Sequence, residues 1–227
     1  TTSRLATREQ QMRLFEIGGM LHTEVMPVPR TDMSCLDDAR LVNYLKDILQ
    51  DPDVPASPEA WQARLLGLGF LTEAADTICC TIAGLVLFGK SPRRYLKQAG
   101  LRVMAFNGED KAYQAALDDI IDGPMVGRWD TDNGEKRLVD GGIIERFMDA
   151  MEPFISKEAS QIDEHLRRDT QWFYPLEAIR EVLINALAHR DWTRFVEIEV
   201  GSYSNRFEVI SPGALPNSMS IEKMKAG

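Results

Sequence analysis

The chain has 227 residues and a formal net charge of −9, with 44% hydrophobic and 27% charged side chains. This is the balance of an ordinary globular protein, whose core is large enough that it needs neither disulfides nor a metal as staples. Such an acidic chain repels duplex DNA unless its cations are sorted onto one face, which excludes a DNA contact spread over the whole surface.

Three cysteines, Cys35, Cys79 and Cys80, provide neither a disulfide framework nor a zinc-binding spacing, because their number is odd and two are adjacent. Reduced thiols suit the cytoplasm, and Cys79 and Cys80 lie in an apolar run that predicts burial. No apolar run approaches the ~18 residues of a membrane span. We therefore expect a cytoplasmic protein without a membrane partner. The polar N-terminus begins abruptly and has no signal peptide, which indicates a piece of a longer chain.

Capping residues and apolar periodicity predict three helices in the N-terminal part. The first covers residues 5–21 after a Thr7 cap, and the second covers Asp37 to Gln50. The third begins with Pro58, which follows a Ser57 cap, and runs towards Leu66.

A short hairpin is expected next, formed by strands at Gly69–Leu71 and Thr77–Cys79. The order of helix, hairpin and apolar segment predicts a winged-helix-like unit.

The segment Gly84–Ser91, GLVLFGKS, matches the phosphate-loop pattern GxxxxGKS letter for letter. A phosphate loop needs small or polar residues between its glycines, so that backbone N–H groups can surround a phosphate. Here these positions hold Leu, Val, Leu and Phe, whose exposure would cost about 1.5–3 kcal/mol each. We therefore favour a buried helix that ends at Gly89 over a nucleotide site.

A basic run follows, in which Lys90, Arg93 and Arg94 are the candidate DNA contacts. The alternative is a solvated helix face, which is the more common role of such a run.

Further along, Leu101–Phe106 is predicted to be a buried strand, and residues 111–123 and 138–158 are predicted to be helices. The second of these helices would bury one apolar face.

The C-terminal third contains the strongest helix pattern, PLEAIREVLINALAHRDW over residues 175–192. Two alternating segments, FVEIEVGSYS at 195–204 and RFEVIS at 206–211, predict strands with a turn at Ser204–Asn205. A loop follows.

Glu181, Asn185 and His189 share one stripe of this helix, because positions four residues apart advance by only about 40°. The stripe suggests a metal–nucleotide site, in which Asn185 offers its side-chain oxygen to Mg²⁺ and Glu181 orients or deprotonates a water. The alternative is a polar stripe that hydrogen-bonds a neighbouring loop. The triplet His189–Arg190–Asp191 that closes the helix is expected to be structural.

The segments EVLINALAHRD and SPGALP, with the hairpin between them, resemble the C-terminal domain of RecG-like transcriptional regulators, which is related to the GHKL ATPases. The middle segment TIAGLVLFGKSPRRYL with LRVMAFNGEDK is also similar to this family. The N-terminal TTSRLATREQQMRLF resembles the end of the preceding Schlafen/AlbA-like DNA-binding domain. The resemblance therefore covers almost the whole chain.

This resemblance implies that Glu181 and Asn185 match the Glu and Asn of the ATPase helix. The ATPases then have an Asp-x-Gly motif whose Asp accepts a hydrogen bond from the adenine amino group. Here the matching residues are Ser211 and Gly213, and a serine lacks the charge of that acceptor. The glycine-rich lid that holds the phosphates is absent as well. Nucleotide-binding candidates are therefore Asn185, His189, Ser211 and Gly213, with ATP and Mg²⁺ as the implied cofactors.

The expected fold is α+β. It comprises a tail of the DNA-binding domain (1–35), a helical and winged-helix-like middle region (36–170) and a truncated GHKL-like module (171–227). The resemblance implies a regulatory or dimerisation region without catalysis, which contacts DNA through the preceding domain and forms a homodimer. The alternatives are an active ATPase that uses Glu181 and Asn185, and a pure interaction scaffold. Helicase activity is not expected, because no credible pair of Walker motifs is present.

Overall fold

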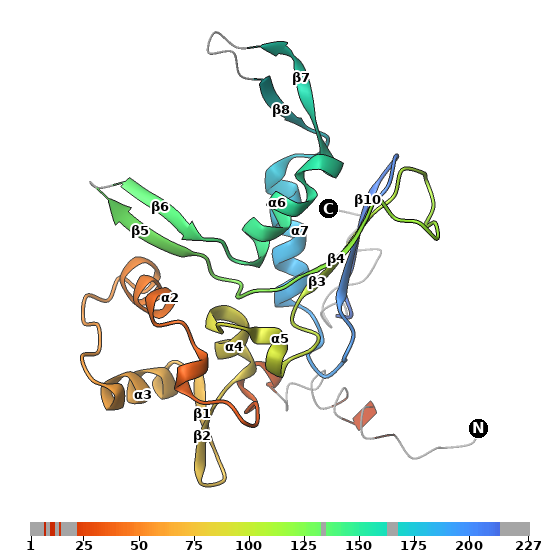
Figure 1. Ribbon diagram of the computed structural model, residues 1–227. Helices are drawn as coiled ribbons and strands as arrows, with labels where there is room; N and C mark the ends of the chain where they lie inside the picture. Colours follow the sequence, from red (N-terminus) through yellow and green to blue (C-terminus); the bar gives the residue numbers. More distant parts are fainter. Residues whose placement is uncertain are drawn as a thin grey trace, which may run out of the picture.

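The computed structural model describes residues 22–132, 135–162 and 168–213, together with residues 7, 10, 11 and 14 near the N-terminus. The described chain is an α+β protein with two apolar cores, one in each half (Figure 1). Most of the helix predicted over residues 5–21 and the loop predicted after Gly213 lie outside the described residues.

The N-terminal half is built from short helices and one hairpin (Figure 1). Its elements are η1 (Thr23–Val25), η2 (Met33–Cys35), α2 (Asp38–Asn43), η3 (Tyr44–Ile48), α3 (Pro58–Gly67), β1 (Leu71–Ala74), β2 (Thr77–Cys80), α4 (Ile82–Phe88) and α5 (Pro92–Tyr95). Here η1 and η2 are 3₁₀ turns and η3 is a π-helical turn that continues α2, so the helix predicted from Asp37 is present but changes its winding.

Side-chain caps explain where these helices begin. Asp37 caps α2 by accepting from the Arg40 N–H, and Ser57 caps α3 by accepting from the Ala60 N–H. Thr81 caps α4 by accepting from the Gly84 N–H. The apolar faces of these helices meet in one core, in which both Phe88 and Cys80 are fully buried.

The C-terminal half contains a four-stranded sheet, two further hairpins and two long helices (Figure 1). Its elements are β3 (Leu101–Ala105), β4 (Leu117–Ile121), β5 (Arg128–Asp132), β6 (Glu135–Asp140), α6 (Ile143–Ile155), β7 (Ser156–Ile162), β8 (Arg168–Trp172), α7 (Leu176–Ala188), β9 (Ile198–Ser202) and β10 (Phe207–Ile210). The sheet order is β10-β9-β3-β4, in which the β3–β9 pair is parallel and the other two pairs are antiparallel.

Helices α6 and α7 pack together with this sheet around the second core. Val103 of β3 and Val200 of β9 pair directly and are fully buried, as are Phe147 of α6 and Leu183 of α7. A single sheet therefore joins β3 and β4 to β9 and β10, on the two sides of the boundary expected near residue 170.

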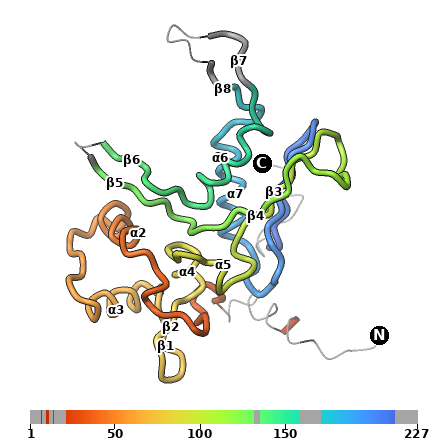
Figure 2. The backbone as a smooth tube through the Cα atoms, viewed as in Figure 1, coloured from red at the N-terminus to blue at the C-terminus, as the bar shows by residue number. Residues whose placement is uncertain are grey.

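The hairpins β5–β6 and β7–β8 project away from the two cores (Figure 1), and the backbone tube in Figure 2 shows β5–β6 from the same viewpoint. Each is a two-stranded antiparallel ribbon with no third strand among the described residues. Arg40 of α2 ties the base of the first ribbon to the N-terminal half, since it pairs with Asp140 at 2.6 Å.

Of the two helices expected in the middle region, the first is wrong and the second is shorter than predicted. Residues 111–123 do not form a helix, because Leu117–Ile121 is strand β4, paired with β3. The helix expected over residues 138–158 is confined to Ile143–Ile155. Strand β6 occupies the residues before it and β7 those after it, so the apolar spacing was extended too far in both directions.

Three predicted β-elements are present, whereas strands β5–β8 were not predicted. The hairpin expected at residues 69–79 is β1–β2, the strand expected at Leu101–Phe106 is β3, and the two C-terminal strands are β9 and β10. None of the described helices is long and apolar enough to cross a membrane.

Candidate functional site

Helix α7 carries the predicted stripe on its outer side. Its inner side is held in the core by Ile179, Leu183, Ala186 and Leu187, all of which are buried. Val182 lies on the outer side and is 43% exposed. The polar stripe therefore lies on a surface that also presents apolar side chains.

Glu181 and Asn185 lie side by side on this exposed surface. The Asn185 amide donates from Nδ2 to Oε1 of Glu181 over 2.9 Å. Because this bond uses the amide nitrogen, the amide oxygen is the atom that Asn185 offers to a hard cation such as Mg²⁺. The geometry thus keeps a carboxylate and an amide oxygen together, one helical turn apart.

The end of β10 packs against the last turns of the same helix. Ser211 Oγ donates to the carbonyl oxygen of Ala186 over 3.1 Å. At Gly213 a Cβ atom would lie only 2.2 Å from the carbonyl oxygen of His189, so the backbone approaches α7 as closely as glycine permits. The fold therefore brings Ser211 and Gly213 to the helix that carries Asn185 and His189.

Ser211 provides a different chemistry from a carboxylate at this place. Its hydroxyl proton is committed to the Ala186 carbonyl, and its oxygen also accepts from the Gly213 N–H at 3.4 Å. A neutral hydroxyl oxygen shared in this way is a weaker acceptor for an amino group than an ionised carboxylate.

The described residues contain no group of three or more His, Cys, Asp or Glu side chains arranged to hold a metal ion. Asn185 and Glu181 therefore supply one amide oxygen and one carboxylate from the protein. Mg²⁺ bound here would need its remaining ligands from water and from phosphate oxygens, which is its usual manner of binding with nucleotides.

The residues that close α7 have a structural role. His189 is the C-cap residue and is exposed, while Arg190 is 3% exposed. The Arg190 guanidinium donates to the carbonyl oxygens of Gln98 and Val196 over 2.6 and 2.7 Å. Burial lowers the pKa of Arg190 to about 10, which leaves the side chain charged at neutral pH.

The three candidate DNA contacts each meet a group of the protein itself. Lys90 Nζ donates to the Ser34 carbonyl oxygen over 2.9 Å, and Arg93 pairs with Glu197 at 2.5 Å. The Arg94 guanidinium lies over the ring of Tyr95, 5.6 Å from its centre. Of the three, Arg93 is the one whose charge is paired with a carboxylate among the described residues, so a phosphate-binding role for Lys90 and Arg94 stays a prediction.

The phosphate-loop pattern is a buried helix, as expected. Gly84, Leu85, Val86 and Phe88 are all buried in α4, and Gly89 is its C-cap. A Cβ at Gly84 would lie 2.2 Å from the Phe70 carbonyl oxygen, so this glycine serves helix packing and not phosphate binding.

Sequence reasoning did not single out Gln98, which the structure places beside a cavity. Gln98 is 97% buried (3% relative exposure), and its Oε1 has no hydrogen-bond partner among the described residues. It lies in a short irregular segment, KQAG, where no periodic pattern marks a buried position.

Comparison with known proteins finds no matching family model and no matching curated protein. Among solved structures the chain is similar to the DIP2311 protein from Corynebacterium diphtheriae, at 18% identity and a TM-score of 0.48. The match covers 96% of this chain and 39% of that protein. The chain thus spans about two fifths of its length.

Proposed function

We propose that this chain is the regulatory region of a RecG-like transcriptional regulator and that it binds adenine nucleotide weakly without hydrolysing it. The observation that carries the proposal is the arrangement at α7, where the Glu181–Asn185 pair is exposed while Ser211 and Gly213 pack against the last turns of the helix. This is the order of parts expected of a GHKL-like site in which the adenine-binding carboxylate is replaced by a hydroxyl.

The arrangement of secondary structure supports the same proposal. α7 is followed by the β9–β10 hairpin, in keeping with the helix and ribbon of a truncated GHKL-like module. α3 followed by β1–β2 supplies a helix and a wing, in keeping with a winged-helix-like middle region. The candidate DNA contacts are paired within the chain and its net charge is −9, so we assign DNA binding to the preceding domain of the whole protein.

Weak binding without hydrolysis follows from what the site contains. Asn185 and Glu181 can bind Mg²⁺, which would in turn bind the phosphates. Ser211, however, gives the adenine amino group only a neutral acceptor. A hydrogen bond to a charged group contributes about 1.5–3 kcal/mol, whereas a neutral one contributes about 0.5–1.5 kcal/mol. The difference of roughly 1 kcal/mol corresponds to an affinity loss of about fivefold.

Isothermal titration with Mg-ATP on the full chain tests this proposal. We expect weak, magnesium-dependent binding that is lost in Asn185→Ala and strengthened about fivefold in Ser211→Asp. The matched control is Glu177→Gln, which changes an exposed glutamate one turn earlier on the same helix and should leave binding unchanged.

A hydrolysis assay separates the proposal from the enzyme alternative. We expect no release of phosphate above background, in the wild type or in Glu181→Gln. Magnesium-dependent turnover that disappears in Glu181→Gln but persists in Glu177→Gln would establish an ATPase instead. No heat at any nucleotide concentration, in the wild type and in Ser211→Asp alike, would leave a pure interaction scaffold.

A further inference from the structure

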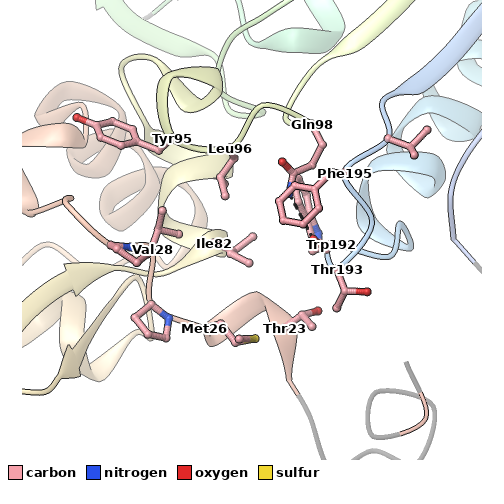
Figure 3. A pocket seen from close by; sticks show the side chains of 13 residues that line it. Thr23, Met26, Val28, Ile82, Tyr95, Leu96, Gln98, Trp192, Thr193 and Phe195 are labelled. Atoms are coloured by element: carbon pink, nitrogen blue, oxygen red, sulfur yellow. Dashed lines mark hydrogen bonds between the residues drawn. The ribbon is translucent and has the colours of Figure 1, made fainter. Parts of the chain in front are cut away.

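A cavity of about 630 Å³ lies between an N-terminal strap (residues 23–29), the α4–α5 segment and the loop that follows α7. Met26 and Val28 form one wall, Ile82 and Leu96 a second, and Trp192 and Phe195 a third (Figure 3). Sites for small organic molecules typically enclose roughly 300–1,000 Å³, so this volume suits a single ligand of that size.

Hydrogen bonds fix the wall made by the N-terminal strap. The Val28 N–H donates to the Cys80 carbonyl oxygen over 2.9 Å, and the Ile82 N–H donates to the Met26 carbonyl oxygen over 3.1 Å. These bonds tie the strap to the end of β2 and the beginning of α4. The backbone of this wall is therefore fixed.

The opposite wall is fixed by Arg190. Its guanidinium donates to the Gln98 and Val196 carbonyl oxygens and lies 4.4 Å from the centre of the Trp192 ring. Asp191 also stabilises this loop, because its Oδ1 accepts hydrogen bonds from both the N–H and the hydroxyl of Thr193. The loop is thus held in the conformation that presents Trp192 and Phe195 to the cavity.

The residues that line the cavity are mostly apolar, and no Asp, Glu, Lys, Arg or His is among them. The phenol of Tyr95 stays neutral, because its hydrogen bond with Cys35 raises the pKa of Tyr95. A charged ligand would lose its hydration here without gaining a counter-charge, which disfavours phosphates and carboxylates. The cavity therefore suits an uncharged molecule.

One polar side chain, Gln98, would orient a ligand in the cavity. Gln98 donates from Nε2 to the Trp192 carbonyl oxygen over 3.3 Å, so its amide cannot turn over without placing two oxygens against each other. Its Oε1 has no partner among the described residues although the side chain is 97% buried (3% relative exposure). A buried acceptor without a donor is unfavourable, and a ligand N–H or O–H would satisfy it once a small shift of the surrounding side chains admits the donor.

The mouth of the cavity is apolar and uncovered among the described residues. Phe195 is 85% exposed and Val196 is 50% exposed, although both belong to the loop that Arg190 holds through the Val196 carbonyl oxygen. Aromatic walls favour an aromatic ligand, which stacks or packs edge-on against rings. A ligand of this kind would also cover the exposed Phe195 ring and gain from its burial.

We propose that this cavity is a binding site for an uncharged aromatic molecule of drug-like size that donates one hydrogen bond to Gln98. The site is separate from the α7 nucleotide site, and its occupant contacts the loop between α7 and β9. Arg194 of that loop donates to the Pro212 carbonyl oxygen over 3.1 Å, which connects the cavity to the segment containing Ser211 and Gly213.

The test uses N-phenyl-1-naphthylamine, an uncharged probe with two aromatic groups and one N–H, whose fluorescence rises in apolar surroundings. We expect saturable binding of one probe per chain. Gln98→Leu should weaken this binding about threefold to tenfold, the range expected for loss of one hydrogen bond. For 1-benzylnaphthalene, which has CH₂ in place of the N–H, the same variant should leave affinity unchanged.

Two further variants locate the binding. Ile82→Trp fills the cavity from the wall that Figure 3 shows opposite Phe195, and it should abolish binding of both probes while the thermal midpoint is retained. Ile48→Ser removes an apolar side chain that is 67% exposed elsewhere and should change nothing. Unchanged binding in Ile82→Trp would overturn the site, and equal loss of both probes in Gln98→Leu would overturn the role of the amide. Neither outcome depends on whether ATP binds.

Discussion

Phe88→Ala tests whether the Gly84–Ser91 segment is a buried helix or a phosphate loop. Phe88 is fully buried, and its ring centre lies 4.9 Å from that of Phe70 and 5.2 Å from that of Tyr44, both edge-to-face. Truncating such a ring removes apolar burial and leaves a cavity, at a cost of about 3–5 kcal/mol. The two aromatic contacts, about 0.5–1.5 kcal/mol each, are part of that total.

Urea denaturation followed by far-UV circular dichroism measures this loss as a lower midpoint with an unchanged slope. A small domain has only about 5–15 kcal/mol of stability, so the effect should be large. The control is Lys90→Ala, at an exposed position two residues away, which should stay within about 0.5 kcal/mol of the wild type. A loss below about 1 kcal/mol in Phe88→Ala, or loss of ATP binding in Lys90→Ala, would refute the buried-helix assignment.

Three other substitutions probe contacts between distant parts of the chain. Arg40→Met should lower the free energy of unfolding by about 3 kcal/mol in a denaturant titration, because Arg40 is 3% exposed and pairs with Asp37 and Asp140. This is the low end for a buried ion pair, since both aspartates are partly exposed. The hydrogen bond from Arg40 lowers the pKa of Asp140 in the folded protein. The stability that this carboxylate contributes is therefore fully present above about pH 3.9, the pKa of an unfolded Asp, and is lost as the pH falls through the lower pKa of the folded state. Asp140 is 40% exposed, so Asp140→Asn should remove no more than about 1 kcal/mol of this acid dependence, and equal acid sensitivity in both proteins would contradict the assignment. Gly213→Ala should cost about 1–3 kcal/mol, since its Cβ would meet the His189 carbonyl oxygen at 2.2 Å, and a thermal midpoint equal to that of the wild type would show that β10 does not pack there.

The elements that sequence reasoning placed well are those whose local pattern agrees with their tertiary setting. Helix α7 has apolar residues at helical spacing, and four of them are buried against the sheet. Ser57 before Pro58 is the predicted cap, and α3 begins where this cap lies. The helix predicted to end at Gly89 is α4, and Gly89 is its C-cap. In each case a short stretch of chain contains both the reason to form the element and the reason to begin or end it.

The elements that were missed are strands made by pairing. β4 has the sequence LDDII, in which two aspartates interrupt the apolar pattern, yet it pairs with β3, and Asp118 meets Arg102 at 3.1 Å across the pair. Strands β5 and β6 are rich in charged residues and form a ribbon that projects from the core (Figure 1). Their conformation depends on hydrogen bonds to another strand, which no local apolar period records.

Some features of the candidate sites could be predicted from the sequence, and others could not. The spacing of Glu181 and Asn185 by itself determined that they share one helix face, because a helix repeats about every 3.6 residues whatever surrounds it. The approach of Ser211 and Gly213 to α7, the pairing of Arg93 with Glu197, and the buried unpaired oxygen of Gln98 were decided only by the tertiary structure. Helical periodicity acts over a few residues, whereas burial and hydrogen bonding join segments that can be a hundred positions apart, and those partners exist only once the chain has folded.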